Sequence, residues 1–596
     1  MHKRRRWLLS LLALLITAAM MAGCGGSGST TKAPAKTEAG KTEAGKTEAE
    51  KTEAKKTEAP EADEDETEAP ATEAPDAEDD EGDEDDEPEN GVESDFDEHM
   101  TITASFWDIA NMFPSEDAFD GVDDVKAYIE SKFNLTIEPV NVGWGDADEK
   151  YTTWAQSGQL PDIVGAAAFV GGSRYYQWVE DGVVRALPAD MDKYPLSKER
   201  LAAPEVTAYN VDDQHWFYPR YTYQDVADWS MDRGLLIRRD WLDALGLDMP
   251  ETEEEYIDTM VAFAQNDPDG NGQDDTVGYL PAQTWLLTSQ AWTGYGFTDG
   301  RWIFNEDGDA RMAIAEKSTL PLMSFLRRMF KAGGMDPDFA TIANEDAIEK
   351  FAQGRVGMFS RQVSPKHLDA IYQKWVILQP DVDFFEAVEF AHGPLVVDNN
   401  VRFAEKIYWS ESYFEANVDD EKMDRILSLY EWIISDEGMA MCAYGIEGKH
   451  YEVEADGSIK LLLDKDPETG QFFPLSNYAP MSGIGHLATW VGDNLQYQNP
   501  SLDPRLIEMA TVERDYRKTE WDDPQVNWPL QGINVPEKEE MAAIRFGDDW
   551  SRFIMDESDA SDEELYEELL SNWNANGYER ACESITAEAQ NMGIID

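Results

Sequence analysis

Hydrophobic and polar residues alternate along 101–107, and this two-residue period predicts a β-strand. A helix is predicted at 121–133, where apolar residues recur at the helical spacing: Val122, Val125, Ile129 and Phe133. The alternating segment 135–140 predicts the next strand. Strand, helix and strand at this spacing indicate a right-handed βαβ unit, and hence an α/β fold with a mostly parallel sheet.

Further helices are marked by their caps and their periodicity. Thr252 with Glu255, and Ser561 with Glu564, have the spacing of capping boxes, in which two side chains and two backbone N–H groups bond reciprocally. Segment 423–434 carries apolar residues on a 3.6-residue period. Helices are therefore expected along most of the chain, as an α/β fold requires.

The first residues have the features of a lipoprotein signal peptide, predicted at 1–23. Basic residues at 2–6 precede an apolar run at 7–21, which is too short for a confident membrane-spanning helix. The run ends Met21-Ala-Gly-Cys24, which resembles the bacterial lipobox and implies a lipid on Cys24 after cleavage before it. Two acyl chains on one cysteine would hold the mature protein at the outer face of the cell membrane. The alternative is an ordinary signal peptide with a chance cysteine.

Residues 24–100 are predicted to be a disordered spacer. The unit Lys-Thr-Glu-Ala occurs five times, beginning at Lys36, and the segment beyond Glu61 is almost purely acidic. Such a sequence has nothing to bury and repels itself. A surface spacer is favoured over a tail that binds cations or a partner protein.

Charge and cysteine content exclude several classes of protein. The 596 residues include 121 Asp and Glu against 49 Lys and Arg, for a net charge of −72, which disfavours binding to nucleic acid or docking by charge on anionic membranes. Three cysteines are too few for a disulfide framework or a zinc ribbon. Cys442 and Cys582 are expected to be buried thiols, with a disulfide between them as the alternative.

One loop has the composition of a calcium site. Residues 266–275 place oxygen-bearing side chains at every second position, and calcium takes six to eight oxygen ligands. By analogy with the EF-hand loop, the expected ligands are side chains and one carbonyl, that of Gln273: Asp267, Asp269, Asn271, Gln273 and Asp275. Position twelve of the loop is Gly278, and a strand is expected at 276–280 in place of a second helix. A structural calcium site is favoured over an unoccupied turn rich in Asp and Asn.

Several motifs together resemble the bacterial extracellular solute-binding proteins, in particular the oligosaccharide-binding lipoproteins of ABC importers. The central motif is Arg-Arg-Asp-Trp-Leu-Asp-Ala-Leu-Gly-Leu at 238–247, followed by Pro250 and Thr252 and then by the calcium-type loop. Segments 157–163, 351–358 and 435–449 agree with the family in the same order. The sequence departs from the alginate-binding relatives at Thr276, where they carry an acidic residue.

The resemblance implies a periplasmic-binding-protein-like fold of type II, with two α/β lobes joined by a hinge that the chain crosses more than once. From the order in which the family's segments enter the two lobes, lobe 1 is expected to hold 101–235 plus about 370–450, and lobe 2 to hold 236–369 plus about 451–596. The resemblance also implies a monomer that is no enzyme and that hands its ligand to ABC permease subunits.

The sequence also favours a sugar ligand, because sugar sites combine aromatic platforms with hydrogen-bonding side chains. Ligands of open α/β sheets lie beyond the carboxyl ends of strands. The candidates follow apparent strands: Trp107, Asp108, Trp144, Asp146, Asp162, Trp285, Arg361 and Trp409. The competing interpretation makes most of these tryptophans core residues. No basic run lies near them, which favours a neutral oligosaccharide.

Two other functions remain open at this point. The motifs of serine hydrolases, zinc proteases and nucleotide-binding loops are absent from the sequence. A surface glycoside hydrolase needs only two placed carboxylates and stays an alternative. A sugar sensor or adhesin without transport is the third; neighbouring permease genes would favour import.

Overall fold

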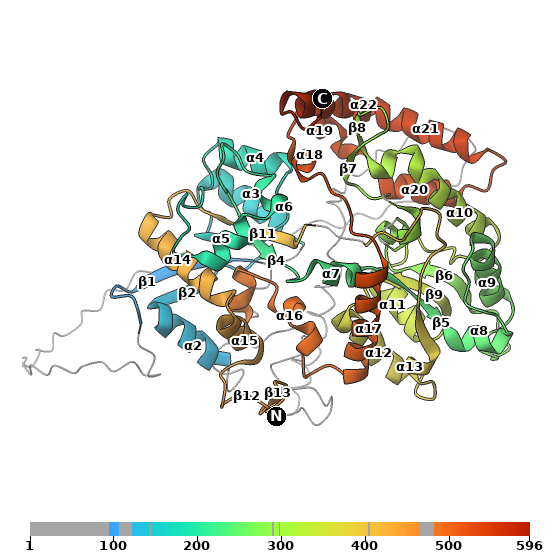
Figure 1. The fold of residues 1–596 in the computed structure, drawn as a ribbon, viewed down its shortest axis with the longest axis horizontal. Helices are drawn as coiled ribbons and strands as arrows, with labels where there is room; N and C mark the ends of the chain where they lie inside the picture. The colour runs from blue at the N-terminus through green and yellow to red at the C-terminus, as the bar shows by residue number, and fades with distance from the viewer. Residues whose placement is uncertain are drawn as a thin grey trace, which may run out of the picture. The chain divides into compact units, whose positions relative to one another are not determined.

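The computed structural model describes residues 94–106, 122–143, 145–288, 291–296, 298–402, 406–464 and 482–595. Two separate sheets, each with its own hydrophobic core, define two lobes (Figure 1). Buried residues from 102–218 and 408–491 form the core of lobe 1, and buried residues from 231–391 and 506–589 form that of lobe 2. No helix in the described ranges combines the length and apolarity needed to cross a membrane.

Lobe 1 is built on a five-stranded sheet in the order β2-β1-β3-β11-β4. Strand β1 runs parallel to β2 and β3, and β11 runs antiparallel to β3 and β4. The strands are β1 (Met100–Ser105), β2 (Leu135–Pro139), β3 (Ile163–Ala167), β4 (Tyr218–Tyr221) and β11 (Tyr408–Phe414). Strands β1 and β2 with helix α2 (Val122–Phe133) confirm the predicted βαβ unit.

The other helices of lobe 1 include α14, the periodic helix that the sequence predicted. They are α3 (Ala147–Ser157), α4 (Ser173–Glu180), α5 (Pro195–Leu201), α6 (Pro204–Thr207), α14 (Asp420–Ile433), α15 (Asp436–Tyr444) and α16 (Val491–Asn494). A small hairpin follows α15, made of β12 (Tyr451–Val453) and β13 (Ile459–Leu461).

Lobe 2 contains a four-stranded sheet in the order β10-β5-β9-β6. Strand β5 runs antiparallel to both neighbours, and β6 runs parallel to β9. The strands are β5 (Gly234–Arg238), β6 (Val277–Pro281), β9 (Val356–Arg361) and β10 (Val388–Ala391), with a separate hairpin of β7 (Trp302–Phe304) and β8 (Ala310–Met312). Both sheets are therefore mixed, because each contains one strand that enters from the other lobe.

Twelve of the described helices belong to lobe 2, and both predicted capping boxes are present, at α9 and α21. They are α8 (Arg239–Leu245), α9 (Glu253–Gln265), α10 (Leu320–Lys331), α11 (Asn344–Ala352), α12 (Pro365–Leu378), α13 (Phe384–Ala387), α17 (Pro504–Glu520), α18 (Trp528–Gly532), α19 (Glu537–Glu540), α20 (Phe546–Met555), α21 (Asp562–Ala575) and α22 (Tyr578–Asn591). Figure 1 shows α17 between the two sheets, beside α7 (Val226–Trp229).

The chain passes between the lobes three times: from β4 to β5, from β10 to β11, and between α16 and α17. The second and third passages lie later than the sequence-based boundaries near 370 and 450, because α12 and β10 pack in the core of lobe 2 and Val491 packs in that of lobe 1. The first two passages leave each sheet at a strand's carboxyl end and enter the other at the start of its antiparallel strand. The carboxyl edges of the two parallel sets therefore both lie at the hinge.

Candidate functional site

The carboxyl edge of lobe 1 presents a group of aromatic rings. Trp409 and Trp490 are half-buried, with ring centroids 5.6 Å apart, and Trp490 lies 5.2 Å from the ring of His486. Tyr223 and Trp229 pack edge to face at 5.0 Å and join Trp409 in one small cluster. The predicted Trp409 lies inside β11, near its start, and does not follow a strand. It still reaches this edge because β11 is antiparallel to its neighbours.

A buried arginine packs against two of the aromatic rings of lobe 1. The Arg220 guanidinium lies 4.6 Å from the Trp490 ring centroid and 5.2 Å from that of Phe106. It donates to the carbonyl of His486 and to Oγ of Ser410, and the Trp490 indole N–H donates to the same Oγ. Burial lowers the pKa of Arg220 to about 9. This network fixes the orientation of the Trp490 ring.

The carboxyl edge of lobe 2 presents cations beside one aromatic ring. Trp285 is half-buried in the 3-10 turn after β6, as the sequence predicted, and the Arg233 guanidinium lies 4.0 Å from its ring centroid. Arg361 ends β9 and pairs across the sheet with Gly234, the residue after Arg233. Both arginines are almost fully buried. Arg233 also forms an ion pair with Asp232.

The two edges are linked by polar contacts at the hinge. The Tyr223 hydroxyl donates to Oδ1 of Asp232 at 2.7 Å, and the Gln362 amide donates to the same oxygen at 3.3 Å. Lys366, in the first turn of α12, forms an ion pair with Asp493 of α16. The Lys366–Asp493 pair joins lobe 2 to lobe 1 directly, and the Tyr223–Asp232 contact fixes the chain segment that crosses between them. The two sets of side chains therefore form one region. We call it the interlobe site.

Histidines at the interlobe site are held neutral. Burial lowers the pKa of His486 to about 3, and the positive charges of Arg220 and Lys366 add to this effect. Burial likewise lowers the pKa of His367 well below its usual range, with further contributions from Lys366, Arg361 and Arg233. Neither histidine can serve as a proton carrier near neutral pH. The charged groups of the site are its arginines and its lysine, together with Asp232 and Asp493, which pair with Arg233 and Lys366.

Several interlobe residues escaped the sequence analysis: Arg233, Tyr223, Lys366, His486 and Trp490. The apolar run Gly234–Arg238 marks a buried strand, but not its antiparallel direction, which is what brings Arg233 to the site. Trp490 follows the Gly-rich turn at 483–487, and this pattern would have added it to the aromatic candidates. Nothing local indicates Lys366, because its place depends on the packing of α12.

Other predicted ligand residues have different positions. Trp107, Asp108 and Trp144 lie outside the described residues. Asp146 precedes α3, accepts from the N–H of Gly143 and pairs with Lys150, which chiefly lowers the pKa of its carboxyl. Asp162 immediately precedes β3, at the amino edge of the sheet. Its carboxylate there accepts from Thr103 and pairs with Lys422, which gives it a role in connecting strands to α14.

The calcium-type loop closes on itself through its own hydrogen bonds. The Asp267 carboxylate accepts from the N–H of Gly272, and the Asn271 amide donates to Asp269 at 2.8 Å and to Asp275 at 3.2 Å. Burial raises the pKa of Asp269, as do its acidic neighbours Asp267 and Asp275. The carboxylates and carbonyls are the oxygen ligands that calcium prefers. As arranged, however, no group of three or more acidic, His or Cys side chains in the described ranges could hold a metal ion.

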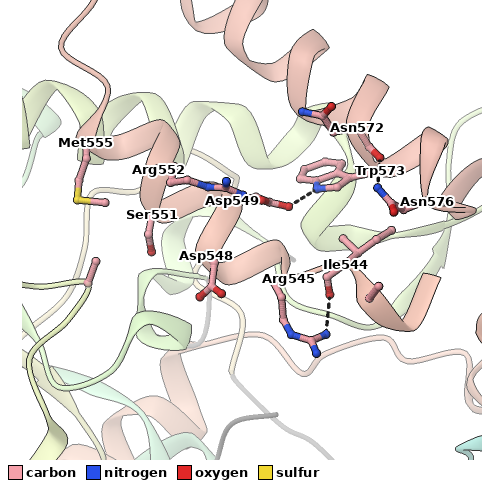
Figure 2. A pocket seen from close by; sticks show the side chains of 12 residues that line it. Ile544, Arg545, Asp548, Asp549, Ser551, Arg552, Met555, Asn572, Trp573 and Asn576 are labelled. Atoms are coloured by element: carbon pink, nitrogen blue, oxygen red, sulfur yellow. Dashed lines mark hydrogen bonds and ion pairs between the residues drawn. The ribbon is translucent and has the colours of Figure 1, made fainter. Parts of the chain in front are cut away.

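A cavity of about 640 Å³ lies within lobe 2, between α20 and the end of α21 (Figure 2). Its lining mixes both signs of charge with amides: Arg545, Asp548, Asp549, Arg552, Asn572 and Asn576. Figure 2 shows Asp549 pointing toward Trp573, whose indole N–H donates to it at 2.7 Å. The ring of Trp573 is almost fully buried, so it offers no stacking face. The sequence-predicted ligand residues do not line this cavity, and we place the candidate site between the lobes.

Cys442 and Cys582 are both free and buried, as expected. Cys442 belongs to the core of lobe 1 and Cys582 to that of lobe 2. Burial raises the pKa of the Cys442 thiol to about 12 and that of the Cys582 thiol to about 11. Both remain protonated near neutral pH and unreactive as nucleophiles.

Two α/β lobes, joined by repeated chain crossings and carrying stacking and ionic groups on the edges that meet at the hinge, define a two-lobed binding protein. The chain belongs to the bacterial extracellular solute-binding proteins, whose family model matches residues 120–437, more than half of its length. The predicted family and the predicted periplasmic-binding-protein-like fold of type II are both confirmed.

Individual relatives are more distant. Lipoprotein LipO of Bacillus subtilis is 25% identical over 342 residues, which cover 54% of this chain and 62% of LipO. The polygalacturonan/rhamnogalacturonan-binding protein YtcQ of the same organism is 24% identical over 234 residues, which cover 38% of this chain and 44% of YtcQ. The chain thus matches less than two thirds of the length of these curated relatives.

Among solved structures, the alginate-binding protein AlgQ2 without calcium ion superimposes with a TM-score of 0.58 at 16% identity. The superposition covers 83% of this chain and 98% of AlgQ2. At this level of identity, the similarity establishes a shared fold.

Proposed function

We propose that the protein binds an oligosaccharide at the interlobe site and delivers it to the membrane subunits of an ABC-type permease. The observation that carries this proposal is the set of half-buried tryptophans, Trp285 on one lobe and Trp409 and Trp490 on the other, with hydrogen-bonding groups beneath them. Pyranose rings have apolar faces and polar edges, so rings of this kind bind between aromatic platforms and polar side chains. The name of YtcQ, a carbohydrate-binding relative, supports the same class of ligand.

Binding on this proposal works by closure of the lobes. A ligand that contacts Trp409 and Trp490 on lobe 1 and Trp285 on lobe 2 stabilises the closed state by its higher affinity for that state. Contacts that already bridge the lobes at the hinge, such as Lys366 with Asp493, limit the motion to a rotation about the crossings. The permease would then recognise the closed form.

The site supports binding in place of catalysis. Its two histidines are held neutral, and the carboxylates of Asp232 and Asp493 are each engaged in an ion pair. A glycoside hydrolase needs one carboxyl that is free to donate a proton and a second that acts as nucleophile or base. Asp232 and Asp493 have a different role, as partners of fixed cations.

We also propose that a lipid on Cys24 anchors the protein and that residues 24–93 act as a spacer. The last residues of the predicted spacer belong to the fold instead: Phe96 and Met100 pack against the core of lobe 1, and β1 begins at Met100. Residues 1–93 lie outside the described residues, so this proposal rests on the sequence. Replacing Cys24 with Ser is expected to move the protein from the membrane fraction to the medium. Retention of the Cys24→Ser variant in membranes would refute the anchor.

The loop after α9 is proposed to bind a structural calcium ion through Asp267, Asp269, Asn271, Gln273 and Asp275. The oxygen ligands of the loop, which calcium prefers, support this site. The hydrogen bonds within the loop would have to break for the ion to bind. The double variant Asp267→Ala, Asp269→Ala should lose any calcium dependence of the melting temperature. Melting curves of the unaltered protein that do not respond to calcium or to chelator would exclude the site.

Native mass spectrometry of the protein with a panel of plant and bacterial oligosaccharides tests the main proposal. The expected result is one intact glycan per protein, with no shorter products. Cleaved products would overturn the proposed binding function and indicate a glycosidase. Absence of any glycan adduct, with binding of a peptide or other small solute, would overturn the carbohydrate assignment.

A further inference from the structure

Three cations of lobe 2 converge on the interlobe site, although they are spread over more than 130 residues of sequence. Arg233 and Arg361 lie at adjacent positions of the β5–β9 pair, because Gly234 pairs with Arg361. Lys366 follows in the first turn of α12. The side chain of His367, which is fully buried, lies within electrostatic reach of all three, and each of them lowers its pKa.

This gathering of positive charge stands out in so acidic a protein. Acidic residues outnumber basic ones 121 to 49, yet Arg233 and Arg361 meet at one edge of one sheet, and Lys366 of α12 lies close enough to act on the same buried histidine. Arg220 adds a fourth cation beneath Trp490 on lobe 1. Burial of cations is costly unless each is paired or hydrogen-bonded, so their gathering at the hinge needs an explanation. Asp232 and Asp493, the carboxylates that pair with Arg233 and Lys366, hold two of these cations in position at the hinge.

We propose that the interlobe site takes an acidic oligosaccharide, with sugar carboxylates bound by Arg233, Arg361 and Lys366 and sugar faces stacked on the tryptophans. This inference rests on the proposed carbohydrate function. It replaces the neutral ligand favoured from sequence, which depended on the lack of a run of basic residues. The fold assembles from distant segments the cations that such a run would have supplied.

The chemistry of the cations selects the carboxylate among anionic groups. A guanidinium presents a planar fork of N–H donors that matches a planar carboxylate in two parallel hydrogen bonds. Contact with the Trp285 ring, whose centroid lies 4.0 Å away, restrains the Arg233 guanidinium and so reduces the entropy that binding would cost. A uronic acid carries both features that the site matches: an apolar ring face and a carboxylate at the ring edge. Free phosphate lacks the face.

Paired ligands test the proposal on the unaltered protein. Titration calorimetry would compare a panel of uronic-acid oligosaccharides with the same compounds after reduction of their carboxyls to alcohols, and with sulfated neutral oligosaccharides. At least one acidic compound should bind about 10- to 100-fold tighter than its reduced form, as expected for charge-assisted hydrogen bonds. Added salt should weaken binding of the acidic form more than that of the reduced form.

A pair of variants tests the assigned cations. Arg361→Gln should weaken binding of the acidic form more than that of the reduced form, and so remove most of the preference, because the charge-assisted bonds are made only to the carboxylate. Arg328→Gln is the matched control: it removes one positive charge from α10, where Arg328 is exposed and pairs with Glu254. It should keep the preference. If Arg361→Gln does not fold, the ratio measured on the unaltered protein decides.

Each other outcome has a distinct meaning. Equal or tighter binding of the reduced forms would overturn the acidic ligand and leave carbohydrate binding intact. Sulfated compounds that bind as tightly as the uronic acids would overturn the selection of carboxylate. A protein that binds no oligosaccharide at all would overturn the proposed function and this inference with it.

Discussion

The two sheet edges that meet at the hinge differ in chemistry, although both lie at the carboxyl ends of strands. Lobe 1 offers Trp409 and Trp490, with Arg220 hidden beneath them. Lobe 2 offers Arg233 and Arg361, with Trp285 as the single half-buried ring described beside them. One lobe supplies mainly faces for stacking, and the other mainly charge. The difference implies that affinity and selectivity depend on separate lobes and can be altered separately.

The largest expected difference between the lobes is the loss of stability when a buried arginine is removed from each. Arg517 on α17 pairs with Glu513 at 2.5 Å and donates to the carbonyls of Ser230 and Arg233, at the entry to lobe 2. Arg517→Met leaves the Glu513 carboxylate buried with only His392 opposite, and should cost about 3 to 5 kcal/mol of unfolding free energy.

Arg220→Met in lobe 1 is the matched variant. Arg220 donates to a carbonyl and to a hydroxyl, so its removal breaks no ion pair with a carboxylate. The expected cost is about 1 to 3 kcal/mol, the penalty of unsatisfied buried polar groups. Urea unfolding measures both variants. Equal losses would contradict the assignment of the greater cost to the uncompensated Glu513 carboxylate.

Tryptophan variants should separate stacking from charge. Trp409→Ala removes a platform that contacts any sugar face, and should lower affinity for acidic and neutral oligosaccharides alike, by about 10- to 100-fold, the value of burying one large apolar side chain. Trp285→Ala also releases the Arg233 guanidinium, and should therefore weaken the acidic ligand more than its reduced form. Calorimetry with the paired ligands measures both ratios. Identical changes in the ratio for the two variants would remove the distinction between the lobes.

Local patterns predicted the local structure well. The 101–140 segment folds as the predicted βαβ unit, and Thr252 and Ser561 cap their helices as their spacing indicates. Each of these features depends on residues within a few turns of one another. The two lobes themselves were inferred from resemblance, and their later boundaries were misplaced because nothing local marks that α12 and β10 stay in lobe 2.

The candidate site was only partly predictable, for a physical reason. Trp285 and Arg361 were found because each follows a strand in the sequence. Arg233 and Trp409 instead reach the same edges from antiparallel strands, in which the first residues lie beside the last residues of the neighbours. Strand direction depends on how the chain crosses the hinge, and the pattern of a single strand does not contain that information.

The smallest expected effect concerns two carboxylates near α17: Asp228, which pairs with Arg514, and Glu513, which pairs with Arg517. Burial raises the pKa of Asp228, on the lobe 1 side of the hinge, to about 6 despite its pair with Arg514. Folding then favours the protonated form, so stability falls as pH rises from about 4 to 6, by about 1 to 2 kcal/mol. Burial opposes ionisation of Glu513 as well, but Arg517 and His392 outweigh it and lower the pKa to about 2, so this stability is lost as pH falls from 4.5 toward 2.

Urea unfolding at a series of pH values should therefore reveal opposite slopes in the two ranges. Asp228→Asn should flatten the slope between pH 4 and 6 and leave the acid limb unchanged, whereas Glu513→Gln should flatten only the acid limb. Each variant is the other's control, because both carboxylates contact α17 residues and differ in whether a cation outweighs burial. If the slope of stability between pH 4 and 6 survives in Asp228→Asn, the slope belongs to another carboxyl. The contrast between Asp228 and Glu513 would then be lost.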